Sequence, residues 1–169
     1  MLHLYFGQGK GKTSAAIGLG IRAAGHGKRV LMVQFLKCRE SGECLFLKDC
    51  KNFTIKRFES EHPFIINPTP AQREKLQKEI SIAFDFATQS VTDYNVIILD
   101  EVLDAVEFGF LNEEKLISLI NIRNNDTEII FTGRNPSKKL LELTDYATDM
   151  KLIKHPYQQG IKARKGIEY

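Results

Sequence analysis

The glycine-rich stretch near the start of the chain is the first group of residues whose types and spacing suggest a reaction. Three glycines alternate with polar residues before a lysine and a threonine. The stretch is Gly7, Gln8, Gly9, Lys10, Gly11, Lys12, Thr13 and Ser14. Glycines permit the backbone angles with which successive amides turn inward around an anion. A helix that begins after them adds its positive end, a lysine ammonium, and a hydroxyl that can bind Mg²⁺. We therefore expect this loop to bind the phosphates of a nucleotide.

The spacing of this loop departs by one residue from the general P-loop pattern. That pattern has four residues between its first glycine and the Gly-Lys pair, whereas three residues separate Gly7 from Gly11. The alternative interpretation is a glycine-rich turn with exposed lysines. An apolar run before the loop and a helical pattern after it are the context of a phosphate loop, and they favour nucleotide binding.

A pair of carboxylates follows a second apolar run. The segment VIILDE ends in Asp100 and Glu101. An apolar strand that delivers carboxylates at its C-terminal end is the Walker-B arrangement, in which one carboxylate binds Mg²⁺ directly or through water. Taken alone, the pair fits a solvated loop start equally well. Its place after the glycine loop favours a metal site that comprises Thr13, Asp100 and Glu101.

Three further groups are weaker candidates. Thr132, Gly133 and Arg134 follow another apolar run and so reach the same edge of the sheet, where the arginine either binds an anion or faces solvent. Arg22 lies three turns into the first expected helix, and this position alone favours a side chain in solvent over one that contacts a triphosphate. His62 lies in an aromatic loop, where packing is more common than metal ligation.

The elements that position these residues alternate between apolar runs and helical patterns. Strands are expected at residues 2–6, 29–36, 53–58, 94–99, 128–132 and 147–153. Helices are expected at residues 13–24, 72–90, 113–122 and 137–143, with Pro70 at the start of the second. The polar stretch 37–51 is expected to be irregular. This alternation predicts an α/β fold with a mostly parallel sheet, helices on both faces, and ligands beyond the carboxyl ends of the strands.

Length, charge and composition narrow the classes of protein to which the chain can belong. A chain of 169 residues is typical of one domain, so we expect residues 1–169 to form a single nucleotide-binding domain, with residues 38–70 as an irregular, lid-like segment. The net charge of +3 fits an anionic small ligand and does not indicate nucleic acid. No apolar run approaches the roughly 20 residues of a membrane span, and no signal peptide is expected. A cytoplasmic protein without membrane attachment is therefore expected.

The chain has three cysteines, Cys38, Cys44 and Cys50. They lack the paired spacing of zinc sites and are expected to be reduced.

Long blocks of the sequence carry a resemblance to a known family. The blocks are GQGKGKTSAAIGLGIRAAGHGKRVLMVQFLK, then VIILDEV with EFGFLNEEKLISLI, then IIFTGRNPSKKLLELTDYATDMKLIKHPYQQGIKARKGIEY. They resemble, in order and over most of the chain, the P-loop type of ATP:corrinoid adenosyltransferases, the cob(I)alamin adenosyltransferases of cobamide biosynthesis. The shortened loop is itself a trait of that family. The resemblance is weakest across residues 38–70.

The resemblance implies a RecA-like fold, a homodimer and a particular reaction. The Co(I) of a reduced corrinoid attacks the 5′ carbon of ATP, an adenosylated corrinoid forms, and inorganic triphosphate leaves. ATP binds with Mg²⁺, with its triphosphate reversed relative to ordinary P-loop enzymes, and a reductase supplies the electron. Because Co(I) is a strong nucleophile, the protein needs no general base; it must position the carbon and neutralise the departing polyanion.

The resemblance also implies roles for individual residues. It assigns the triphosphate to the loop residues 7–14 together with Arg22, and the metal to Glu101 with Asp100 beside it. Catalysis then depends on Lys12, Arg22 and Glu101. The aromatic residues expected on the corrinoid side are Phe58 and Phe64.

The alternative is an ordinary P-loop NTPase or kinase without corrinoid chemistry, or a nucleotide-controlled interaction module. A nucleic-acid-dependent RecA-like ATPase is a third interpretation, but it calls for a more basic groove than a net charge of +3 provides. The phosphate product distinguishes these classes, because only adenosyl transfer releases the triphosphate intact.

Overall fold

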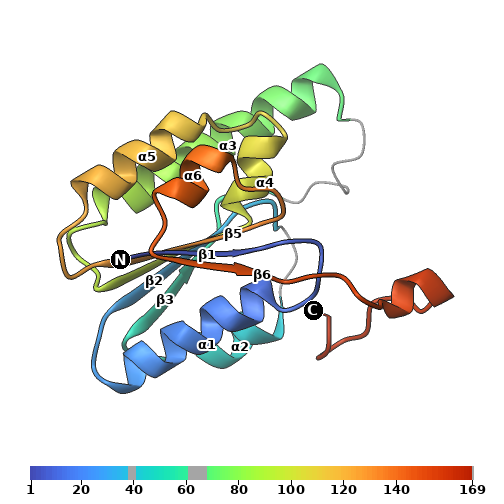
Figure 1. Ribbon diagram of the computed structural model, residues 1–169, viewed down its shortest axis with the longest axis horizontal. Coiled ribbons are helices and arrows are strands. Elements are labelled where there is room, and N and C mark those ends of the chain that lie inside the picture. Colours follow the sequence, from blue (N-terminus) through green and yellow to red (C-terminus); the bar gives the residue numbers. More distant parts are fainter. Residues whose placement is uncertain (38–40, 61–67, 169) are drawn as a thin grey trace.

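A parallel β-sheet forms the centre of the computed structural model, which describes residues 1–37, 41–60 and 68–168 (Figure 1). The strands are β1 (Leu2–Phe6), β2 (Val30–Gln34), β3 (Phe53–Lys56), β4 (Val96–Asp100), β5 (Glu128–Thr132) and β6 (Tyr146–Asp149). Their order across the sheet is β3-β2-β4-β5-β1-β6, and each neighbouring pair is parallel. The expected α/β fold with a parallel sheet is confirmed, and its strand order is that of a RecA-like P-loop fold.

Helices cover both faces of this sheet, as the alternating pattern predicted (Figure 1). They are α1 (Lys12–Gly25), α2 (Gly42–Leu47), α3 (Pro70–Gln89), α4 (Val102–Glu107), α5 (Glu113–Ile122) and α6 (Lys138–Glu142), with a 3₁₀ turn at Pro156–Gln159. α1 and α2 lie on one face, and α3, α4, α5 and α6 lie on the other. Parallel strands buried on both faces read as continuous apolar runs, and β2 and β4 are buried at every position.

Alternate residues of each central strand enter two separate cores. In β4, Ile97 and Leu99 pack in the larger core with α3 and α5, whereas Val96 and Ile98 pack in the smaller core with α1. Side chains alternate between the faces of a strand, so one short run of sequence stabilises both layers. The glycine loop and the two carboxylates are thereby fixed to a rigid sheet.

The strand order sets the distance between the two predicted chemical groups. β5 lies between β1, which carries the glycine loop, and β4, which carries Asp100. The side chain at the end of β5, Thr132, is therefore placed between them at the carboxyl edge of the sheet. This edge is the one that we expected to bind ligands.

Several boundaries differ from the sequence-based expectation. Part of the segment 38–70 is not irregular, because α2 forms at Gly42–Leu47. A helix of six residues with a single buried side chain, Leu47, leaves no periodic signal to detect. β2 ends at Gln34 rather than at residue 36, because Leu36 turns the chain with a positive φ of 59°. Within the described ranges, no helix combines the length and apolar character that a bilayer span requires.

The glycine loop packs directly against the segment that follows β6. The Gly9 amide donates a hydrogen bond to the Met150 carbonyl oxygen at 2.6 Å. A Cβ at Gly9 would lie 2.5 Å from that oxygen and 2.8 Å from the Lys151 carbonyl oxygen. Gly7 has a φ of 108°, and its Cβ would lie 2.7 Å from the Met150 oxygen. Glycine at position 9 is therefore required by packing against backbone, and at position 7 by both packing and backbone angle.

We predict that Gly9→Ala destabilises the fold, because the added methyl group meets backbone carbonyls that cannot rotate away. The free energy of unfolding should fall by about 1–3 kcal/mol, as for other overpacked sites. The matched control is Gly18→Ala, in the middle of α1, where an added Cβ meets nothing within 4 Å. It should raise stability by about 0.5–1 kcal/mol through helix propensity. Urea unfolding measures both, and equal effects of the two variants would contradict the packing argument.

Candidate active site

The loop between β1 and α1 closes around the ammonium group of Lys12. Lys12 Nζ donates to the carbonyl oxygens of Gly7 and Gly9, each at 2.8 Å. Burial lowers the pKa of Lys12. Gly11, which precedes α1, has no side chain to cap the first-turn amides, so these donors face the loop at the positive end of the helix dipole. The Gly7 and Gly9 amides donate to backbone carbonyls outside the loop. The groups that remain for an anion are the first-turn amides of α1 and the Lys12 ammonium.

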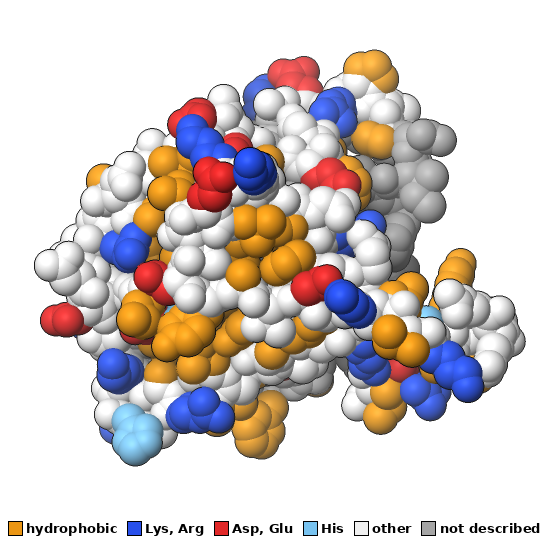
Figure 2. Space-filling model, viewed as in Figure 1, with side chains coloured by type: hydrophobic (Ala, Val, Ile, Leu, Met, Phe, Trp, Pro, Cys, Tyr) orange, Lys and Arg blue, Asp and Glu red, His pale blue; other side chains and the backbone are white. Residues whose placement is uncertain are grey.

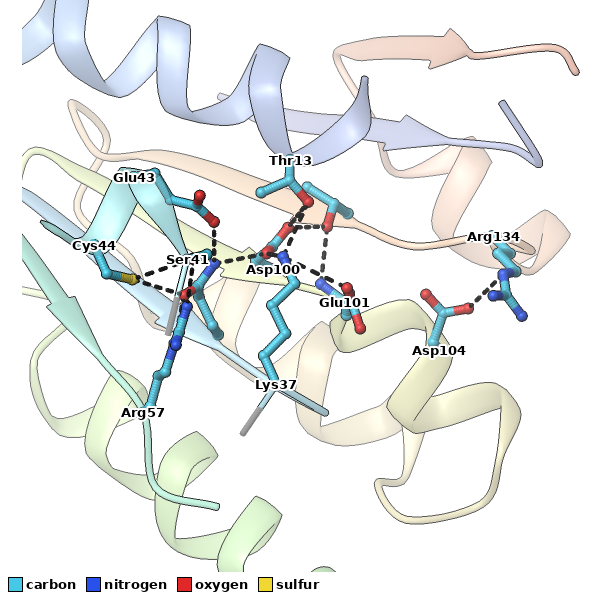
Figure 3. Close-up of polar contacts among 12 residues, drawn as sticks. Thr13, Lys37, Ser41, Glu43, Cys44, Arg57, Asp100, Glu101, Asp104 and Arg134 are labelled. Atoms are coloured by element: carbon cyan, nitrogen blue, oxygen red, sulfur yellow. Dashed lines mark hydrogen bonds and ion pairs between the residues drawn. The ribbon is translucent and has the colours of Figure 1, made fainter. Parts of the chain in front are cut away.

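Asp100 lies beneath this loop, fully buried and surrounded by donors (Figure 3). Its Oδ1 atom accepts hydrogen bonds from the hydroxyls of Thr13 at 2.8 Å and Thr132 at 2.7 Å. Its Oδ2 atom accepts from Lys37 Nζ at 2.6 Å and Gln34 Nε2 at 3.2 Å. Burial acts to raise the pKa of Asp100, but the Lys37 ammonium and these hydrogen bonds outweigh it and lower the pKa. Asp100 is therefore an ionised carboxylate.

Lys37 approaches the carboxylates from the loop after β2. Its ammonium nitrogen lies 2.6 Å from Asp100 Oδ2, 3.5 Å from Glu101 Oε1 and 3.3 Å from the Thr13 hydroxyl. Burial opposes the charge of Lys37, but the two carboxylates overcome it and raise the pKa of the ammonium. The ammonium therefore contacts each of the three side chains that the sequence assigned to the metal.

Glu101 is held beside Asp100 by an unusual backbone turn. It is a non-glycine residue in the left-handed region, with φ of 62° and ψ of 17°, immediately before α4. Its amide donates to the Thr132 hydroxyl at 2.8 Å. Burial raises the pKa of Glu101, against the opposing charge of Lys37. Strained backbone is concentrated at functional sites, which supports a role for this carboxylate.

The third candidate group reaches the same edge of the sheet, as expected. Thr132 bridges Asp100 and Glu101 through the two hydrogen bonds given above. The Arg134 carbonyl oxygen accepts from the Gly7 amide at 3.0 Å, while Arg134 Nε lies 3.7 Å from Asp104 Oδ1. This segment supports the loop and the carboxylates.

A pocket of about 590 Å³ opens beside the loop. Its volume is within the range of roughly 300–1,000 Å³ that is typical of small-molecule sites. The lining residues come from the loop, one face of α1, the ends of β2 and β4, the start of α2 and the C-terminal tail. They are Gly9, Lys10, Gly11, Lys12, Thr13, Ser14, Ile17, Gly18, Ile21, Lys37, Gly42, Glu43, Glu101, Gly166, Ile167 and Glu168.

The C-terminal tail forms a wall of this pocket that the sequence did not reveal. Lys10 Nζ donates to the Ile167 carbonyl oxygen at 3.0 Å and contacts Glu168 Oε1 at 3.1 Å. Hydrogen bonds from Arg164 lower the pKa of Glu168 to about 2. The tail is mostly exposed, and Figure 2 shows its basic side chains gathered at the right of the molecule. The C-terminal tail thus contributes residues 166–168 to the site.

The remaining predicted residues either do not line the pocket or lie outside the described residues. Gln8 lies outside the pocket lining and contacts Asn135 at 3.4 Å. Arg22 is exposed in the last turn of α1 and does not line the pocket. Phe58 is half-buried against Phe86, with 5.2 Å between ring centroids. The predictions for Phe64, His62 and Cys38 lie outside the described residues.

Gln34 and Lys37 are site residues that the sequence interpretation missed. Gln34 is fully buried and accepts from Arg57 Nε at 2.7 Å while it donates to Asp100. Gln34 ends β2 and Lys37 follows it, and β2 lies next to β4 in the sheet. The rule that ligands bind beyond the carboxyl ends of parallel strands would have directed attention to them.

A protein family and several curated relatives match this chain over all or nearly all of its length. The family described as ATP:corrinoid adenosyltransferase BtuR/CobO/CobP matches residues 1–169. A corrinoid adenosyltransferase of Pseudomonas aeruginosa is 32% identical over 177 residues, which cover 100% of this chain and 83% of the relative. Corrinoid adenosyltransferase CobA of Salmonella typhimurium is 32% identical over 174 residues, 98% of this chain and 84% of that protein. Among solved structures, EssC (ATPases 2 and 3) of Geobacillus thermodenitrificans has a TM-score of 0.49 at 15% identity, over 98% of this chain and 34% of that one.

We predict that Thr132→Val destabilises the protein, because the near-isosteric change leaves Asp100 without one donor and the Glu101 amide without its acceptor. The free energy of unfolding should fall by about 1–3 kcal/mol. The control is Thr148→Val on the exposed edge strand β6, which should change stability by no more than about 0.5 kcal/mol. Denaturant unfolding measures both variants, and a neutral Thr132→Val would show that the bridge is unimportant.

A second prediction concerns Glu59, which is buried near the turn at Leu36 and Lys37. Burial raises its pKa from 4.5 to about 7, although the nearby amides of those two residues oppose the shift. The folded state then binds the proton more tightly than the unfolded state, so Glu59 stabilises the fold most at low pH. That contribution is lost as the pH rises from about 4.5 to above 7, and it totals up to about 3 kcal/mol.

Glu59→Gln should therefore be more stable than the wild type at pH 8, and this advantage should shrink towards pH 5. Thermal or denaturant unfolding at both pH values measures the difference. The exposed Glu142, paired with Lys138 at 3.7 Å, provides the control, since Glu142→Gln should show no such trend. A pH-independent difference for Glu59→Gln would contradict the burial argument.

Proposed function

This chain belongs to the ATP:corrinoid adenosyltransferase family, whose members adenosylate corrinoids with ATP, and from this premise we propose how its pocket performs the transfer. ATP binds along the glycine loop and α1, with its triphosphate at Lys12 and the first-turn amides. The Co(I) of a reduced corrinoid attacks the 5′ carbon. A cobalt–carbon bond forms from the cobalt electron pair, the bond from the 5′ carbon to oxygen breaks, and triphosphate leaves with that bonding pair. The observation that supports this site is the convergence of Lys12, Thr13 and Glu101 on one pocket.

The residues around that pocket suit a departing polyanion. Lys12 and the first-turn amides of α1 provide positive charge and hydrogen-bond donors where the triphosphate develops its charge. The chain supplies no base and no covalent nucleophile in this proposal, because Co(I) itself is the nucleophile. Its task is to hold the 5′ carbon and the leaving group in line.

The side chains at the base of the pocket fit a Mg²⁺ ion. The Thr13 hydroxyl and the carboxylates of Asp100 and Glu101 are oxygen donors close to one point, and the Lys37 ammonium lies against all three, which supports a cation site. Bound Mg²⁺ would neutralise charge on the triphosphate. Thr132 would keep the two carboxylates in place through its bonds to Asp100 and the Glu101 amide.

Arg22 is proposed as a second triphosphate contact, although it lies about 15 Å along α1 from Lys12. Helical side chains lean towards the N-terminus of their helix. One turn before Arg22 is Gly18, which lines the pocket and has open space around it. The absence of a side chain at Gly18 gives the guanidinium a clear path back over α1 to the pocket.

The corrinoid side is proposed to lie by the segment 38–70. α2 lines the pocket through Gly42 and Glu43, and Phe46 on the same helix is 82% exposed. Phe58 is already packed against Phe86, which leaves Phe46 as the better placed aromatic among the described residues. Cob(I)alamin and cob(I)yrinic acid a,c-diamide are the proposed substrates. We also propose a cytoplasmic location, as expected from the sequence, and a homodimer and an electron-donating reductase, as the family resemblance implies.

The decisive experiment identifies the phosphate product. With ATP, Mg²⁺ and chemically reduced cobalamin, the protein should form one adenosylated corrinoid and one triphosphate per turnover. Without Co(I), hydrolysis to ADP should be slow. Absorbance of the corrinoid and chromatography of the phosphates measure both products. Rapid release of ADP and phosphate, with no adenosylated corrinoid, would indicate an ordinary NTPase.

The same assay should place the reaction at the loop. Lys12→Ala should slow turnover by roughly 100- to 1,000-fold, as for other lost electrostatic contacts to a transition state. Lys28→Ala removes one positive charge just before β2, at the end of that strand away from the pocket, and should leave turnover unchanged. Equal rates for the two variants would move the site away from Lys12.

A further inference from the structure

The ammonium group of Lys37 lies where the proposed metal ligands converge. It is 2.6 Å from Asp100 Oδ2, 3.3 Å from the Thr13 hydroxyl and 3.5 Å from Glu101 Oε1 (Figure 3). These three side chains are the oxygen donors that fit a Mg²⁺ ion. A divalent cation and this ammonium therefore compete for the same oxygens.

The position of Lys37 suits a cation that can leave. Its side chain is 23% exposed and lines the pocket, whereas Asp100 has 0% exposure. The lysine thus enters from the open side, while Asp100 lies underneath. Asp100 also accepts hydrogen bonds from Thr132 and Gln34, from strands on either side of β4. These two contacts keep the carboxylate in place when the ammonium moves.

We propose that Lys37 is a tethered monovalent cation that holds the metal position, and that a divalent cation binds by displacing its ammonium. Until the metal arrives, Lys37 balances the charge of two adjacent carboxylates. Displacement leaves the ammonium on the pocket wall, where the proposed triphosphate binds. Metal binding would thereby also add a positive charge for the leaving group. This inference rests on the metal ligands of the proposed function and is independent of the corrinoid reaction.

The test uses Mn²⁺ alone as the probe, followed by the loss of the free Mn²⁺ signal in electron paramagnetic resonance. Neither ATP nor corrinoid is present, so the outcome is separate from that of the transfer assay. Lys37→Met keeps the length of the side chain and removes the competing charge. It should bind Mn²⁺ about tenfold more tightly than the wild type, because two like charges no longer contend for one site.

Two controls locate the effect. Lys28→Met removes one positive charge before β2, at the opposite end of that strand from Lys37, and should leave the affinity for Mn²⁺ unchanged. In the double variant Lys37→Met/Asp100→Asn, the gain should disappear, because a proposed ligand is lost. An unchanged or weaker affinity in Lys37→Met, or an equal gain in Lys28→Met, would overturn the proposal.

A measurement on the wild-type protein keeps the proposal testable if Lys37→Met fails to fold. An amine-reactive reagent with mass spectrometry reports the labelling rate of each lysine. Saturating Mn²⁺ should raise the labelling rate of Lys37 at least about threefold and leave that of Lys28 unchanged, because only the ammonium of Lys37 is released from an ion pair. Bound Mn²⁺ without faster labelling of Lys37 would refute displacement, and so would the absence of any Mn²⁺ binding.

Discussion

The burial of one ionised carboxylate, Asp100, is the constraint on which the site depends. A charge without solvent must be compensated by donors in close contact, and here they come from different parts of the chain. Thr13 lies in the first turn of α1, Gln34 ends β2, Lys37 follows β2, and Thr132 ends β5. Each donor must be at the sheet edge for the carboxylate to stay ionised. The same contacts therefore join the glycine loop, three strands and the candidate metal ligands into one unit.

The sequence predicted those parts of the structure that short-range rules determine. The glycine loop, the carboxylates after β4 and the helix that begins at Pro70 each carry a local signal, and α3 does begin at Pro70 with a capping box at Thr69. Lys37 and Gln34 carry none, because their roles depend on β2 lying next to β4. The sequence suggests that position 9 is glycine because of its backbone freedom. In the structure, glycine is required there because a Cβ would collide with residues more than a hundred positions away in the chain.

The pocket combines rigid and peripheral elements. The loop, α1 and the carboxylates rest on the sheet, whereas the segment after β2 and the tail at residues 166–168 close the sides. Family membership gives the reaction class, and the geometry gives the proposed division of labour within it. A nucleophile that the substrate brings needs no activation, so the chain's contribution is binding, orientation and charge balance. This explains a pocket rich in amides, lysines and hydroxyls.

The contact between Gly9 and the Met150 carbonyl has a consequence for biosynthesis. A ribosome delivers the glycine loop before the strand β6 and the segment that follows it, and domains generally fold as units once their parts have emerged. The phosphate loop of a nascent chain lacks the backbone against which it is shaped. Nucleotide binding therefore matures only after residues 150 and 151 have been synthesised. A message terminated before the codon for Met150 yields polypeptides with the complete glycine motif but without its packing partner.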